Sequence, residues 1–209
     1  MASPGLAIPK FEPMPLARLH APFDHPDWIF ELKYDGWRAL AYIDIGVCRL
    51  VSRNGNPFTR FADLCAAMAV AVPGTVVLDG EIACLDDDGR PQFYELMRRY
   101  KAPTFCAFDL LWLNGRDLRG LPLLERKRLL RKLTRWPLLY VDHVAHSGVD
   151  LFNAACKQDL EGIVAKLANG RYEPGATTWV KIKNRSYSQA EGRAEFFERE
   201  AGKRGRENF

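Results

Sequence analysis

The first half of the chain alternates short apolar runs with turn-forming sequences. Residues 28–32, 37–45 and 47–52 are rich in aromatic and β-branched side chains, so they predict three strands that form an antiparallel meander. Asn54-Gly55 follows the third run directly and is the strongest short-range signal for a tight turn. The pattern therefore predicts a small sheet between residues 28 and 55.

Helical and strand-like patterns alternate along the remainder of the chain. Apolar residues recur at helical spacing in 61–70, 93–100 and 123–133, and Asp150 is a candidate N-cap for a fourth helix that ends at Lys157. Further apolar runs predict strands at residues 75–85, 105–113, 161–166 and 178–183.

One of these helical segments, residues 123–133, carries a basic face. Its leucines lie opposite Arg126, Lys127, Arg131 and Lys132. Charge runs on surface helices most often belong to a solvated face. We therefore predict that these four side chains are exposed to water, in preference to a stripe dedicated to nucleic acid.

Composition and charge restrict the class of protein. Hydrophobic residues make up 47% of the 209 positions, enough for one sizeable core, and 30 Lys+Arg against 26 Asp+Glu give a formal charge of +4. Five scattered cysteines without a Cys-x-x-Cys pair argue against a disulfide framework. The sequence has neither a run of about 18 apolar residues nor an apolar leader, so we expect a cytoplasmic protein that does not enter a membrane.

Proline and charge mark the two ends of the chain. Four prolines within residues 1–20 predict an extended N-terminal arm, and the charged, glycine-containing residues 190–209 predict a tail. The body of the protein is then one domain over residues 21–189.

Lys33 is the centre of the candidate chemistry. It ends the first apolar run and precedes Asp35-Gly36, which turns the chain sharply, so the sequence presents an amine at the end of a strand. A nucleophilic lysine needs a lowered pKa, an electrophile held in line and neutralisation of charge on the leaving group. The rest of the chain supplies residue types that fit these tasks.

These further candidates are charged or aromatic residues at the ends of, or within, other predicted strands. They are Lys166, Lys181 and Lys183 for phosphate binding, Glu81 and Glu161 for Mg²⁺, Arg38 and Arg53 for phosphate or ribose oxygens, and Phe108 for stacking on a base. A structural interpretation stands beside each of them, because buried carboxylates usually pair with Lys or Arg and an aromatic residue in a buried strand is most often core.

Six short motifs stand in order along the chain. They are Lys33-Tyr-Asp-Gly-Trp-Arg38, Ser52-Arg-Asn-Gly55, Leu78-Asp-Gly-Glu81, Phe105-Cys-Ala-Phe-Asp109, Glu161-Gly-Ile-Val-Ala-Lys166 and Trp179-Val-Lys-Ile-Lys183. Each alone is weak evidence, but in this order they resemble the nucleotidyltransferase motifs of ATP-dependent DNA ligases, from about residue 13 to residue 184. The resemblance implies an α+β, ATP-grasp-like nucleotidyltransferase domain in which antiparallel sheets pack with helices around an ATP cleft.

The resemblance also implies a reaction. Lys33 would attack the α-phosphate of ATP, release pyrophosphate and hold AMP through a phosphoramide bond, with Mg²⁺ or Mn²⁺ near Glu81 and Glu161. AMP would then pass to the 5′-phosphate of nicked duplex DNA, and the adjacent 3′-hydroxyl would displace it. The setting would be DNA repair or recombination in the bacterial cytoplasm, in association with the nucleoid.

The same resemblance implies which residues bind the adenosine. Glu31 would lie beside the adenine, Phe108 would stack on it, and Leu32 would also contact the nucleotide. Arg38 and Glu81 would contact the ribose region.

A second group of residues would bind phosphate. Lys181 and Lys183 would hold the α-phosphate with assistance from Lys166. Arg53 would touch either the nucleotide or the 5′-phosphate of the nick.

Ligases of this family are expected to continue into an OB-fold domain. The 25 residues after Asn184 (209 minus 184) are too few for a five-stranded barrel. We therefore expect a monomeric adenylation core that binds nicked DNA and works with a separate OB-fold or repair protein. RNA ligation, capping-type nucleotidyl transfer and a truncated nick-binding module that needs such a partner are the alternatives.

Overall fold

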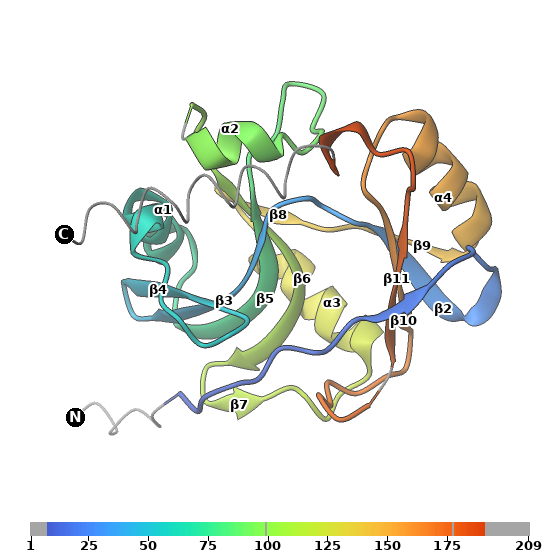
Figure 1. Cartoon of the computed structure of the whole chain (residues 1–209). Coiled ribbons are helices and arrows are strands. Elements are labelled where there is room, and N and C mark those ends of the chain that lie inside the picture. The colour runs from blue at the N-terminus through green and yellow to red at the C-terminus, as the bar shows by residue number, and fades with distance from the viewer. Residues whose placement is uncertain (1–7, 99, 177, 191–209) are drawn as a thin grey trace, which may run out of the picture.

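The computed structural model describes residues 8–98, 100–176 and 178–190, and two sheets form the body of the protein (Figure 1). In spatial order, the first sheet consists of β1 (Ala17–Leu19), β11 (Trp179–Lys183), β10 (Gly162–Leu167), β2 (His25–Leu32) and β9 (His143–His146). The second consists of β4 (Val47–Ser52), β3 (Trp37–Asp44), β5 (Thr75–Ala83), β6 (Thr104–Leu113) and β7 (Arg116–Asp117), with β8 (Leu138–Tyr140) also paired to β6. Neighbouring strands are antiparallel except in the pairs β1–β11 and β6–β8.

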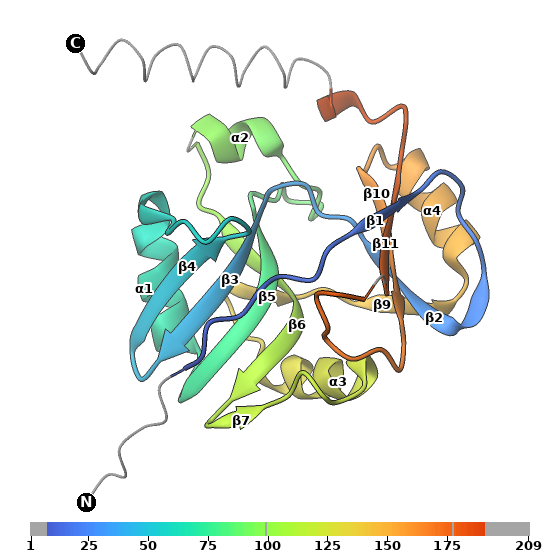
Figure 2. The same cartoon turned by 60° about the horizontal axis from the view of Figure 1, so that its bottom comes forward.

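Helices pack around the two sheets (Figure 1). They are α1 (Ala62–Ala71), α2 (Phe93–Arg98), α3 (Leu123–Leu133) and α4 (Gly148–Lys157), with short 3₁₀ turns η1 (Thr59–Phe61) and η2 (Ser188–Ala190). The sheets stand side by side, with α1 on the far side of the second sheet and α4 on the far side of the first (Figures 1 and 2). The predicted α+β architecture is therefore confirmed. In the described part of the chain, no helix is both long and apolar enough to cross a membrane.

The predicted meander is wrong in one respect, because β2 does not belong to the same sheet as β3 and β4. β3 pairs with β4 and β5, whereas β2 pairs with β10 and β9. Residues 33–36 carry the chain from one sheet to the other. A Cβ atom on Gly36 would lie 2.1 Å from the carbonyl oxygen of Ile82 in β5, so only glycine fits this crossing. Sequence proximity suggested pairing, but the crossing places Lys33 between the sheets.

Residues 8–16 of the N-terminal arm form no helix or strand, and they include side chains of the core. Phe11 and Met14 are 3% and 0% exposed, and they pack in one cluster with Tyr42 of the second sheet and Trp179 of the first. The arm then joins the first sheet as β1. Its apolar side chains therefore help to hold the two sheets together, which the prolines alone did not indicate. Residues 191–209, most of the predicted tail, lie outside the described residues.

Half of the predicted solvated face on α3 is buried. Arg126 and Lys127 are 0% and 1% exposed, whereas Arg131 and Lys132 are exposed as predicted. The reason is that buried carboxylates on neighbouring strands pair with Arg126 and Lys127. Helical periodicity showed which residues share a side, but it could not show that acidic partners lie opposite them.

Asp150 does not cap α4. The helix begins at Gly148 after Ser147, and no side chain of its own N-cap residue accepts a hydrogen bond. Asp24 takes this role from a distant part of the chain, since the backbone N–H of Val149 donates to its Oδ1 atom at 2.9 Å. The capping carboxylate is therefore non-local.

Candidate active site

Lys33 lies directly after β2, where the chain leaves the first sheet. Its backbone N–H donates to the carbonyl oxygen of Gly162 at 2.9 Å, which fixes the start of the crossing. Gly162 has φ of 132°, and a Cβ atom there would lie 2.1 Å from the carbonyl oxygen of Ile182. Glycine is therefore needed where β10 begins.

A carboxylate stands between two lysines at this end of the sheet. The Nζ atom of Lys33 lies 2.5 Å from Oε2 of Glu161, and the Nζ atom of Lys183 lies 2.8 Å from Oε1. Burial lowers the pKa of nearby Lys181, and the charges of Lys183, Lys33 and Arg53 lower it further. The structure thus gathers three predicted lysines around one carboxylate, although they come from β11 and from the end of β2.

A pocket opens beside Lys33 between the two sheets. Seven of the residues predicted to react with or bind a nucleotide line it, namely Glu31, Leu32, Lys33, Arg38, Glu81, Phe108 and Lys166. Four further residues complete the lining, namely Leu16, Tyr34, Val164 and Trp179. Lys181, Lys183 and Glu161 are not part of this lining, but Glu161 and Lys183 connect to it through Lys33.

Two aromatic rings and two cations form one wall of the pocket. The rings of Phe108 and Trp179 meet edge to face, with centroids 5.7 Å apart. The Nζ atom of Lys166 lies 4.2 Å from the Phe108 centroid and 4.0 Å from that of Trp179, and Cζ of Arg38 lies 5.5 Å from each. These are cation–π distances. Phe108 therefore faces the pocket, and Trp179 is a lining residue that sequence reasoning did not select, although it begins the motif that contains Lys181.

Glu31 is buried at the back of the pocket. It is 2% exposed, and its two carboxylate oxygens are bound by two lysines: Lys127 Nζ at 2.5 Å and Lys166 Nζ at 2.6 Å. Burial lowers the pKa of Lys166 to about 8, against the opposing effect of Glu31. Lys127 comes from α3, and no motif in the sequence pointed to it.

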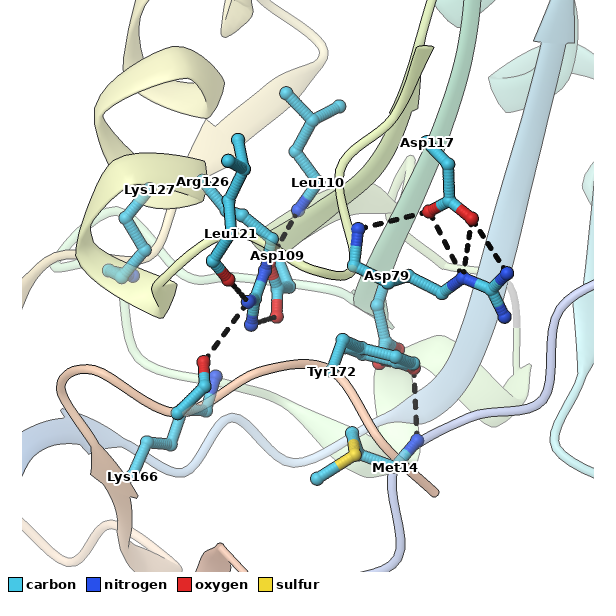
Figure 3. A network of polar contacts seen from close by, with 12 residues as sticks. Met14, Asp79, Asp109, Leu110, Asp117, Leu121, Arg126, Lys127, Lys166 and Tyr172 are labelled. Carbon is cyan, nitrogen blue, oxygen red and sulfur yellow. Dashed lines mark hydrogen bonds and ion pairs between the residues drawn. The ribbon is translucent and has the colours of Figure 1, made fainter. Parts of the chain in front are cut away.

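Arg38 lines the pocket, but its fork of donors is already bound. Nε and Nη2 donate to Asp79 at 3.1 and 2.7 Å, and Nη1 donates to the carbonyl oxygen of Met14 at 2.6 Å. The hydroxyl of Tyr172 donates to Asp79 and accepts from the Met14 N–H (Figure 3). Together with Arg38, these residues form a closed ring of polar contacts. Asp79 and the Met14 carbonyl oxygen thus occupy three donors of Arg38, and its predicted contact with a ribose or phosphate oxygen stays a prediction.

Glu81 is a pocket carboxylate whose pKa is raised. Burial raises its pKa to about 7, while Lys33 and Arg38 act in the opposite direction and Glu161 adds to the rise. Two neighbouring carboxylates beside lysines suit a magnesium ion that is completed by substrate phosphates. Across the described residues, no group of three or more His, Cys, Asp or Glu side chains could form a cage for a metal by itself. Glu81 and Glu161 thus fit a metal that arrives with a nucleotide.

Arg53 lies apart from the pocket around Lys33. It lines a separate hollow together with Lys10 and Arg49, beside the turn after β4. The predicted turn is confirmed, since the N–H of Gly55 donates to the carbonyl oxygen of Ser52 and Gly55 has φ of 82°. Arg53 is near enough to influence Lys181 electrostatically, but it does not line the pocket beside Lys33.

A buried ion pair anchors α3 behind the site. Both donors of the Arg126 fork bind Asp109 at 2.8 Å, and Nη1 also donates to the carbonyl oxygens of Leu121 and Gly170 (Figure 3). Both side chains are 0% exposed. Because Asp109 follows Phe108 in β6, this pair fixes the strand that carries the pocket ring to the helix that carries Lys127.

This arrangement is that of a nucleotidyltransferase domain in which a lysine lines a pocket between two sheets. Residues 15–183 match the family model described as the ATP dependent DNA ligase domain, so the chain belongs to this family. The match covers more than half of the chain and includes all six motifs.

Individual relatives agree with this assignment. The chain is 31% identical over 188 residues to the SPbeta prophage-derived DNA ligase-like protein LigB of Bacillus subtilis, covering 85% of this chain and 68% of that protein. It is 38% identical over 163 residues to the multifunctional non-homologous end joining DNA repair protein LigD of Mycobacterium tuberculosis, covering 75% of this chain and 22% of LigD. The chain therefore spans about a fifth of the length of LigD.

Solved structures show the same fold. The structure of mycobacterial DNA ligase D complexed with ATP and MES aligns with a TM-score of 0.73 and 34% identity, covering 83% of this chain and 60% of that one. The Chlorella virus DNA ligase-adenylate aligns with a TM-score of 0.60 at 15% identity, which shows likeness of fold alone.

Proposed function

We propose that this chain is the adenylation core of an ATP-dependent DNA ligase and that Lys33 carries AMP as a covalent lysyl adenylate. One observation carries the proposal: the Lys33 amine lies 2.5 Å from Glu161 at a pocket lined by Glu31, Phe108 and Lys166. These contacts support the proposal, because an amine, a carboxylate that accepts its N–H and an aromatic ring lie at or beside one hollow.

The chemistry of the first step follows from these contacts. The Nζ atom of Lys33 forms a bond to the α-phosphorus of ATP while the bond to the pyrophosphate oxygen breaks, and pyrophosphate leaves. Glu161 already accepts an N–H of Lys33, so it is placed to take the proton that the attacking amine loses. Lys183 shares the same carboxylate and lies beside Lys181, so both lysines can neutralise phosphate charge.

Two carboxylates would hold the metal. Glu81 and Glu161 would bind Mg²⁺ or Mn²⁺ together with the nucleotide phosphates, and the ion would supply neutralisation of charge on the leaving pyrophosphate. A Glu81 carboxyl with a pKa of about 7 is readily deprotonated when a cation approaches.

The DNA would bind beside the hollow that contains Arg53. Lys10, Arg49 and Arg53 give this hollow a positive lining suited to a phosphodiester backbone. We infer that Arg53 contacts the 5′-phosphate of a nick, in preference to the nucleotide. The adenylate would pass to that phosphate, and a 3′-hydroxyl would displace AMP and seal the strand.

Covalent labelling tests the proposal. The protein is incubated with Mg²⁺ and α-labelled ATP or GTP, and denaturation-resistant label is measured. Label from ATP that is absent in Lys33→Ala supports adenylation, whereas an unlabelled wild-type protein contradicts it. Chasing the labelled protein with nicked DNA and nicked RNA, with and without a separate OB-fold protein, identifies the acceptor and any need for a partner.

A further inference from the structure

The Glu31 carboxylate is shared between two lysines that differ in position. Lys166 comes from β10, lines the pocket and stands between the rings of Phe108 and Trp179. Lys127 comes from α3 and is absent from the pocket lining. Both ammonium groups are buried, at 1% residue exposure, and each binds one oxygen of Glu31.

Lys127 is firmly held at its own position. Its Nζ atom donates to the carbonyl oxygen of Val141 at 2.8 Å as well as to Glu31 at 2.5 Å, and it lies 4.7 Å from the centroid of Tyr140. The neighbouring Arg126 anchors the same turn of α3 to Asp109. The helix therefore delivers a fixed cation to the rear of Glu31.

The charges of this cluster do not balance. Two lysines share one carboxylate, so the cluster carries an excess positive charge in a buried site, where charge interactions are strong. The other charged or titratable groups around it are Asp109 with its partner Arg126, Arg38, Tyr34, Tyr140 and His143. Asp109 is already paired with Arg126, so it offers Lys166 little compensation.

We propose that Lys127 is a positioning residue: it binds one oxygen of Glu31 from outside the nucleotide pocket and leaves the Lys166 ammonium only half of that carboxylate. The electrostatics agree with this geometry. Burial lowers the pKa of Lys166 to about 8, Glu31 opposes the shift, and Lys127 adds to it. Lys127 thereby makes Lys166 easier to deprotonate and fixes the carboxylate beside the pocket.

The proposal makes a sign-specific prediction for Lys127→Met. Glu31 would keep Lys166 as its partner, so no carboxylate is left without a cation, and Lys166 would hold its proton more firmly. We expect its acid dissociation constant to fall roughly ten- to a hundredfold. Glu31→Gln should move it in the opposite direction. Lys127→Arg retains the cation and should restore the wild-type value.

The experiment is a pH titration of the Lys166 side chain by NMR, in protein labelled with ¹³C and ¹⁵N at lysine and without nucleotide. Lys166→Arg assigns the resonance. Lys132→Met is the matched control, because Lys132 is an exposed lysine on the same helix and should leave the titration unchanged. Lys127→Gln provides a second neutral variant that can still donate to Val141, should the methionine variant fail to fold.

The titration separates this inference from the proposed function, on which its relevance to adenylation rests. A midpoint for Lys166 that is the same in wild type and in a folded neutral Lys127 variant overturns the inference. If the midpoint shifts but ATP never labels Lys33, the positioning role stands and the proposed function fails. If both hold, the alkaline limb of the pH profile for Lys33 labelling should move to higher pH in Lys127→Met and return in Lys127→Arg.

Discussion

The ion pair between Arg126 and Asp109 offers a test of what holds the site together. Both side chains are 0% exposed, and two hydrogen bonds of 2.8 Å join them. Replacing Arg126 with methionine keeps most of the side-chain volume but leaves the Asp109 carboxylate without a cation. Its remaining described donor is the backbone N–H of Leu110, at 2.8 Å.

The expected loss is large for a single substitution. Removing one partner of a buried ion pair typically costs about 3–5 kcal/mol. The carbonyl oxygens of Leu121 and Gly170 also lose their Arg126 donor, which places the expectation at the upper end of that range. In a chain of this size, a loss near 5 kcal/mol lowers the melting temperature by roughly 10–20 °C.

Urea unfolding of a double-mutant cycle provides the measurement. The free energy of unfolding is compared for wild type, Arg126→Met, Asp109→Asn and the double variant, in which no buried charge lacks a partner. The double variant should therefore be less destabilised than the sum of the single variants. Arg119→Met is the matched control, because its pair with Asp117 has similar geometry but is about 40% exposed and should cost about 0–1 kcal/mol (Figure 3).

Two results would refute this reasoning. One is a loss in Arg126→Met as small as in the Arg119→Met control. The other is strict additivity in the cycle, which would mean that the two side chains contribute independently despite their contact.

Further predictions concern the pocket and its neighbouring hollow. Phe108→Ala should raise the KM for ATP in Lys33 labelling by roughly 5- to 150-fold, because one base–aromatic stack is worth about 1–3 kcal/mol, and Phe108→Tyr should retain most of the affinity; equal KM values would exclude stacking. Arg53→Ala should leave labelling of Lys33 intact and slow the transfer of AMP to nicked DNA; an equal loss in both steps would contradict its placement outside the nucleotide pocket. Burial raises the pKa of the Glu81 carboxyl from 4.5 to about 7, so the folded protein binds the carboxyl proton more tightly than the unfolded chain does. The contribution of Glu81 to stability is therefore lost as pH rises from about 4.5 to 7. Glu81→Gln should thus raise the melting temperature more at pH 8 than at pH 5, and an identical shift at both would sink the explanation.

Local sequence patterns predicted most helices and strands. The predictions that failed concerned contacts between residues far apart in the sequence, and very short strands. Residues 47–52 and 123–133 form β4 and α3 with the predicted bounds, since strand and helix periods are local properties. β8 and β9 were missed because each is only three or four residues long. β2 was assigned to the wrong sheet and the Asp24 cap was missed for the same reason. In both cases the hydrogen-bond partner is a segment far away in the sequence, and a local pattern does not identify such a partner.

By itself, the sequence determined the family, the strand that ends at Lys33 and the residue types of the pocket. The order of motifs and the period of apolar residues are properties of the linear sequence, so they can be identified without the tertiary structure. Only the tertiary structure decided how charges pair. The carboxylate of Glu31 binds Lys127, which lies 96 positions away in the sequence, and the side chain of Arg38 binds Asp79. A buried charge requires a partner, and whether one is near depends on the packing of elements that sequence separation does not reveal. Two residues of the helix face predicted to be solvated, Arg126 and Lys127, are therefore buried behind the pocket beside Lys33.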